Sequence, residues 1–100
     1  MSDARLVLIN KTDNVLVCCG KVSAQETVEI NGSNFTMPVD INVGHKVARN
    51  DIKKGDKIIK YGAAIGSSTK DIGIGEHVHI HNIQSDYIPS HTRASKVGII

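Results

Sequence analysis

Three histidines alternate with apolar residues in a short segment of the chain. They are His77, His79 and His81, and Asn82 follows them directly. In an extended strand, alternate side chains lie on one face, about 6.6 to 6.8 Å apart, so Val78 and Ile80 should face the core. Imidazoles gathered on one face can chelate a metal ion, donate hydrogen bonds to a carboxylate, or move protons near neutral pH. A polar, solvated face is the alternative interpretation, but three histidines on one face favour a functional site.

A short motif, D-I-x-x-G followed by a polar residue, occurs three times and precedes expected strands. The complete copies start at Asp40, Asp51 and Asp71, and residues 22–26 form a degenerate further copy. In chain order, residues 22–26 are the first copy, and the complete copies are the second, third and fourth. The isoleucine should anchor each copy in the core, and the glycine should supply a backbone conformation that other residues resist. The copies are unequally spaced, which argues against a solenoid and favours a compact all-β domain with tight corners.

His45 occupies the polar position of the second copy, where the other complete copies carry Asp56 and Glu76. From the residues alone two interpretations stay open: a polar residue at the start of a strand, or a pocket residue near the histidine strand. A complete metal site within this chain would need a third or fourth ligand from His45, Glu76 or another chain. The metal ligands therefore stay unassigned.

The composition predicts one small folded domain with an aliphatic core, because 40% of the 100 residues are hydrophobic and only 3% are aromatic. The net charge of +2 is scattered, without a basic block or an aromatic platform, so we expect no nucleic-acid partner. No apolar run approaches the roughly 20 residues that cross a bilayer, and the N-terminus lacks signal-peptide features. We therefore expect a cytoplasmic protein without a membrane partner. Cys18 and Cys19 should be free thiols on opposite faces of a strand.

Strand signals are common along the chain, whereas helix signals are weak throughout. We expect strands over residues 6–9, 15–19, 27–30, 34–37, 46–48, 57–60 and 77–80. Asn31-Gly32 is a strong hairpin-turn signal, Asp13-Asn14 favours local turn chemistry, and Tyr61 should lie half-exposed at the end of a strand. The expected organisation is a domain over residues 1–84 and a tail or linker over residues 85–100.

Several short motifs, in this order along the chain, resemble those of one known family. They are D-N-V at residues 13–15, G-H-K-V-A at residues 44–48, I-K-Y-G-x-x-I-G at residues 59–66 and G-E-H-V-H-x-H-N at residues 75–82. Together they look like the N-terminal module of altronate and galactarate dehydratases, which is called a SAF domain and has a β-clip fold. The resemblance covers about residues 5 to 84 and implies a small, all-β, SAF-like domain of short strands and tight turns.

The resemblance also implies a part in the metal-dependent elimination of water from a sugar acid. His45, His79 and His81 match the family's recurring positions and are expected to be catalytic, whereas His77 and Asn82 are expected to bind substrate. For Asn82 the alternative is that it orients a ligand or a histidine. A divalent metal, iron or manganese, is expected in the full enzyme, where it would polarise the substrate and help hydroxide to leave.

The family's full enzymes carry a large catalytic domain after this module, and related sulfolactate sulfo-lyases divide the two parts into a small and a large subunit. We therefore expect a large catalytic dehydratase subunit or domain as the partner, a sugar-acid substrate, and no activity from this chain alone. Self-association into a homo-oligomer is left open. The alternatives are the small subunit of a sulfo-lyase, which removes sulfite instead of water, and a non-enzymatic SAF binding module.

Overall fold

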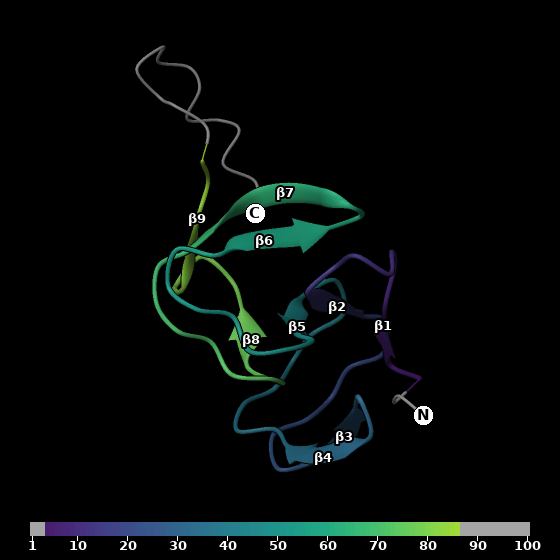
Figure 1. The fold of residues 1–100 in the computed structure, drawn as a ribbon. Helices are drawn as coiled ribbons and strands as arrows, with labels where there is room; N and C mark the ends of the chain where they lie inside the picture. Colours follow the sequence, from purple (N-terminus) through teal and green to yellow (C-terminus); the bar gives the residue numbers. More distant parts are fainter. Residues whose placement is uncertain (1–3, 87–100) are drawn as a thin grey trace.

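The computed structural model describes residues 4–86, which form nine strands and no helix (Figure 1). The strands are β1 (Leu6–Val7), β2 (Val15–Cys18), β3 (Thr27–Ile30), β4 (Ser33–Thr36), β5 (Lys46–Ala48), β6 (Lys57–Lys60), β7 (Ala63–Ser68), β8 (His77–Val78) and β9 (Ile83–Gln84). The prediction of a small all-β domain with short strands is confirmed. A search of the same residues for a helix that could cross a membrane finds none.

Four strands form an antiparallel sheet in the order β1-β2-β5-β8. Figure 1 shows β5 between β2 and β8 in the middle of the molecule, with the β3–β4 hairpin at one end and the β6–β7 hairpin at the other. All three residues of β5 are buried as a result. Because Val47 of β5 pairs with His77 of β8, the segment that begins at His45 lies beside the histidine segment.

The four copies of the repeat pair two by two at their anchoring residues. Val22 forms a β-bridge with Ile41, and Ile52 forms one with Ile72. All four side chains are at most 1% exposed. Gln25 of the degenerate copy has a φ of 76°, and the same left-handed conformation is taken by the glycines of the complete copies, Gly44, Gly55 and Gly75. The predicted anchoring and turning roles are confirmed.

Two hairpins have turns in which both central residues have positive φ, as type I′ turns require. The β3–β4 turn is the predicted one, with φ of 52° at Asn31 and 82° at Gly32. The β6–β7 turn has φ of 58° at Tyr61 and 75° at Gly62, and the sequence did not predict it. Both of its N–H groups donate to the buried carboxylate of Asp13, at 3.0 and 2.7 Å. Asp13 therefore makes long-range contacts that the predicted local turn did not include.

Four expected strands, β1, β2, β4 and β8, end earlier in the structure than the apolar pattern suggested, and two of them leave exposed apolar side chains. β1 stops at Val7, and the side chains of Leu8 and Ile9 that follow are 37% and 40% exposed. β8 stops at Val78, so the expectation that Ile80 faces the core is wrong, because its side chain is 69% exposed. Cys18 is buried and Cys19 is exposed, and both are free, as predicted.

The contacts of the domain extend slightly past residue 84, the predicted end of the domain. Asp86 accepts hydrogen bonds from Lys57 Nζ and Ser67 Oγ, both at 2.7 Å, so it is tied to β6 and β7. Residues 87–100 of the predicted tail lie outside the described residues.

Candidate active site

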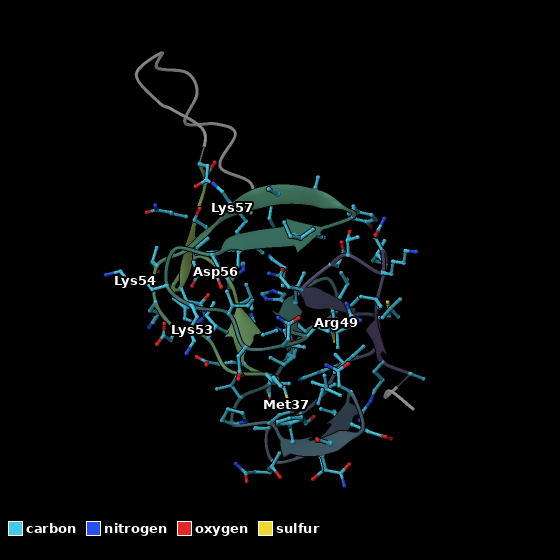
Figure 2. All side chains as sticks on the ribbon, in the orientation of Figure 1. Met37, Arg49, Lys53, Lys54, Asp56 and Lys57 are labelled. Atoms are coloured by element: carbon cyan, nitrogen blue, oxygen red, sulfur yellow. The ribbon has the colours of Figure 1, made fainter. Side chains whose placement is uncertain are left out.

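His45 differs from the residues at the same position of the other repeat copies. In those copies a carboxylate closes its own turn by accepting from the N–H three residues earlier, and the carboxylates belong to Glu26, Asp56 and Glu76, at 2.6, 3.0 and 2.8 Å. Figure 2 shows Asp56 of the third copy together with Lys53 and Lys54 on the loop between β5 and β6. The ring of His45 instead contacts His77. The second copy therefore has its polar side chain available for a site.

The predicted histidines do gather into one cluster. His45 Nδ1 lies 3.0 Å from His77 Nε2. The ring of His79 is centred 4.9 Å from that of His45 and is stacked on that of His77, 5.4 Å away. The ring of His81 is also 5.4 Å from that of His77. The structure therefore brings together all four histidines that the sequence predicted. His45 directly precedes β5, His77 opens β8, and His79 and His81 lie in the turn that follows β8.

A turn, and not a continuous strand, brings His79 and His81 into the cluster. The strand ends at Val78, and residues 79–82 turn the chain toward β9. The Asn82 side chain holds this turn, because its Oδ1 accepts from the N–H of His79 at 2.9 Å and its Nδ2 donates to the carbonyl of His77 at 2.8 Å. The predicted gathering of the histidines is therefore reached by a different local geometry.

Asn82 is placed where it cannot contact a substrate directly. Its side chain is 0% exposed, and both of its polar atoms bond to the backbone of the histidine segment. Of the two expectations for this residue, binding a substrate or orienting a histidine, its position is compatible with the second.

Lys46 is a residue of the cluster that the sequence reasoning missed. It follows His45, is only 3% exposed, and forms no ion pair within residues 4–86. Burial lowers the pKa of its ammonium group, and the positive charge of Lys60 lowers that pKa further. The signal available in the sequence was a lysine inside the apolar strand K-V-A, directly after a candidate site residue.

The electrostatics of the cluster favour neutral imidazoles. The pKa of His77 is lowered to about 4, first by burial and then by the positive charges of the other three histidines and Lys46. The pKa of His79 is also lowered, first by burial and then by the charges of His45, Lys46 and His81. A neutral imidazole has a free lone pair, so at pH 7 these rings can accept a proton or coordinate a metal.

Three of the histidines have donor atoms close enough together for one metal ion. One ring nitrogen from each of His45, His77 and His79 lies within 4.8 Å of the others, and all three side chains are half-buried. Imidazole nitrogens suit zinc, iron, copper and nickel, whereas magnesium, calcium and manganese prefer oxygen ligands. Of the two metals expected from the sequence, iron fits this donor set better than manganese.

A shallow apolar pocket of about 180 Å³ lies between residues 35–38 and residues 73–76. Met37, which Figure 2 labels beside the β3–β4 hairpin, contributes to its wall. None of the predicted site residues lines this pocket, so it does not form part of the histidine cluster.

Taken with the all-β fold, the four clustered histidines and the buried lysine define the chain as a small β module that gathers imidazole side chains next to a buried ammonium group. The sequence model for the altronate/galactarate dehydratase SAF domain matches residues 4–86, and the chain belongs to this family.

The relatives include enzymes of very different length. The chain is 40% identical over 80 residues to the altronate dehydratase of Bacillus subtilis (strain 168) and 38% identical over 80 residues to that of Escherichia coli (strain K12). Each alignment covers 80% of this chain but only 16% of the relative. The chain is also 46% identical over 60 residues to the (2R)-sulfolactate sulfo-lyase subunit alpha of Paracoccus pantotrophus, covering 58% of this chain and 90% of that subunit. The predicted resemblance is confirmed, and the catalytic roles of the histidines stay predictions.

Proposed function

We propose that this chain is the SAF module of a sugar-acid hydro-lyase of the altronate/galactarate dehydratase type, and that a large catalytic domain or subunit completes its active site. The observation that carries the proposal is the histidine cluster on a domain of this family: the half-buried side chains of His45, His77 and His79 lie next to the buried Lys46, and the exposed His81 lies beside them. The module alone is expected to be inactive.

Elimination of water from a sugar acid needs a base and an acid on the same substrate. The base takes the proton on the carbon next to the carboxylate, the electron pair of that C–H bond forms the double bond, and the hydroxyl group on the next carbon leaves as water after protonation. The ring of His79 suits the base, because its lowered pKa keeps it neutral at pH 7 with a lone pair free to accept a proton, and its side chain is half-buried. His45 and His81 are the candidates for the acid.

Lys46 supplies positive charge where the substrate carboxylate becomes more electron-rich. Its ammonium group is close enough to lower the pKa of both His77 and His79. A fixed cation in a partly dehydrated site stabilises such developing negative charge. A divalent metal, when bound, would polarise the carboxylate and the departing hydroxyl group, and His45, His77 and His79 are the residues of this chain that fit it. A ring nitrogen that holds a metal has no lone pair left for a proton, so with a metal on these three rings the base would be His81 or a group of the catalytic domain.

Two exposed apolar side chains beside the cluster support a partner that covers it. Val43 precedes Gly44 and His45 and is 62% exposed, and Ile80 lies between His79 and His81 and is 69% exposed. Contiguous apolar patches rimmed by polar residues mark surfaces that another polypeptide covers, and Val43 and Ile80 would contribute to such a patch. The altronate dehydratases extend far beyond the segment that this chain matches, which agrees with a large partner domain or subunit. Two free cysteines agree with a reducing, cytoplasmic location.

The small subunit of a sulfo-lyase is the second candidate. The alignment accounts for 90% of the Paracoccus pantotrophus alpha subunit, so in that relative a segment similar to this chain makes up nearly the whole of a named subunit. Elimination of sulfite needs the same proton abstraction next to a carboxylate, and only the leaving group differs. The geometry of this module therefore fits both reactions.

The experiment is an assay of this chain, its large catalytic chain from the same source, and their mixture. Altronate, galactarate and sulfolactate are the substrates, and the 2-keto acid or sulfite formed is measured. Activity only in the mixture, lost in His79→Ala and retained in the exposed loop variant Lys54→Ala, supports the proposal. Release of sulfite but not water selects the second candidate, and a mixture that releases neither overturns both.

A further inference from the structure

We propose that His45, His77 and His79 form a three-nitrogen site that binds one divalent transition-metal ion in this chain alone, without the catalytic partner. The ion belongs to the class that imidazole prefers, such as zinc, cobalt(II), iron(II) or nickel. The proposed lyase function does not require this, since the metal of a complete enzyme could be held by the catalytic domain.

The distances in the cluster are close to those of a bound ion. At metal–nitrogen distances of about 2.0 to 2.1 Å, two nitrogens on one ion lie about 2.9 to 3.4 Å apart for angles between 90° and the tetrahedral value. The 3.0 Å separation of His45 Nδ1 and His77 Nε2 falls in this range. The donor of His79 lies within 4.8 Å of the other two, so a rotation of its side chain is enough to complete the site.

The backbone positions of the three histidines are fixed before any metal binds. His77 is held by pairing with Val47 in the sheet, and the carbonyl of His45 accepts from the N–H of Cys18 at 2.8 Å. Asn82 holds the carbonyl of His77 and the N–H of His79. Only side-chain rotations are left to order on binding, which reduces the entropy cost.

The chemistry of the surroundings sets the selectivity of the site. The carboxylate of Glu76, the nearest acid in the sequence, is turned away and accepts from the N–H of Gly73. With nitrogen donors and no carboxylate among the three ligands, the site should reject magnesium and calcium. Lys46 adds a positive charge nearby, which weakens binding of any cation. The 3.0 Å contact has a second explanation, a hydrogen bond between two neutral rings, and the experiment separates the two.

The test is a titration of the full chain, freed of metal by chelation and kept reduced with a phosphine, at pH 7.5. Cobalt(II) binding is followed by its visible absorption, and zinc binding by calorimetry. We expect saturation at one ion per chain, and no heat with magnesium or calcium. His45→Gln, His77→Gln and His79→Gln should each weaken binding by about tenfold or more, whereas Cys19→Ser, which removes the exposed thiol, should leave it unchanged.

The His81→Gln variant is the matched control, because His81 belongs to the cluster but not to the three-nitrogen group. It should bind cobalt(II) with little change. Circular dichroism and thermal unfolding of each variant show that it is folded. The proposal is overturned if the chain shows no saturable binding, if His81→Gln or Cys19→Ser loses as much affinity as His45→Gln, or if His45→Gln binds normally. Because the catalytic chain is absent, none of these results affects the lyase assay.

Discussion

Replacing Asn82 by alanine should disorganise the histidine cluster without touching a histidine. The Asn82 side chain is fully buried and makes two hydrogen bonds, one to the N–H of His79 and one to the carbonyl of His77. Alanine can replace neither bond. The turn that brings His79 back over His77 then has no side chain to hold it, so the rings should sample positions outside the cluster.

The expected loss of stability follows from these two bonds. A net hydrogen bond contributes about 0.5 to 1.5 kcal/mol, and a buried group left without a partner costs about 1 to 3 kcal/mol. Asn82→Ala should therefore lower the free energy of unfolding by about 2 to 4 kcal/mol. Metal affinity and lyase activity should fall by about 10- to 100-fold, the usual effect of removing a residue that orients a ligand.

Asn14 offers a control with the same pair of bonds at another place. Its Oδ1 accepts from the N–H of Ile59 and its Nδ2 donates to the carbonyl of Lys57, both at 2.8 Å. Asn14→Ala should also destabilise the fold, by about 1 to 2 kcal/mol, because its partly exposed site lets water replace the lost bonds. Urea unfolding measures both stabilities, and cobalt(II) titration measures the site. If Asn82→Ala binds metal as well as Asn14→Ala does under conditions where both are folded, the positioning role is refuted.

Three further predictions concern the stability, the pH response and the partner surface. His45→Glu should restore the carboxylate that closes the turn in the other copies, because it can accept from the N–H of Asn42. The free energy of unfolding should then rise by about 0.5 to 1.5 kcal/mol, while metal binding is lost. An unchanged or lower urea midpoint would contradict this. The pKa of His77 is lowered from 6.5 to about 4, so the unfolded chain binds more protons between these values. In the metal-free fold the contribution of His77 to stability should be fully present above pH 6.5 and lost as the pH falls toward 4. The pKa shift corresponds to a change of about 3 kcal/mol in the free energy of unfolding, which solvent screening reduces to about 1 to 2 kcal/mol. Urea unfolding of His77→Gln across this pH range should lack this part of the pH dependence. Ile80→Glu should weaken association with the large chain in a pull-down or calorimetric assay, whereas Val39→Glu, at another exposed apolar residue, should not; equal affinities would exclude Ile80 from the interface.

Local patterns predicted most of the strands and the repeat, because those features depend on neighbours in the sequence. The D-I-x-x-G copies contain their own anchor and their own turn, so Ile41, Ile52 and Ile72 could be assigned to the core without knowing the topology. The Asn31-Gly32 hairpin was equally predictable, since its two residues alone favour positive φ.

Features that depend on distant residues were not predictable. Tyr61 adopts a positive φ that tyrosine disfavours, and Asp13, far away in the sequence, receives the N–H groups of that turn. Lys46 is buried only because β5 lies between two other strands, which no single strand pattern reveals. The early end of β8 has the same origin, since the Asn82 side chain bonds to the backbone where a longer strand would have bonded to a neighbour.

The histidine cluster depends on one departure from the repeat. In the first, third and fourth copies an acidic side chain closes its own turn. In addition, the aspartate that opens each complete copy accepts from an N–H of the paired copy: Asp40 from Ala24, Asp51 from Ile74 and Asp71 from Lys54. The second copy receives neither kind of contact, because it ends in His45 and its paired copy is preceded by Lys21. Its backbone is still held, since the N–H of Gly44 donates to the carbonyl of Cys18 and the N–H of Cys18 donates to the carbonyl of His45, both at 2.8 Å. The sheet thus stabilises this turn without help from its side chain, and a structural position of the repeat is free to carry a histidine toward β8.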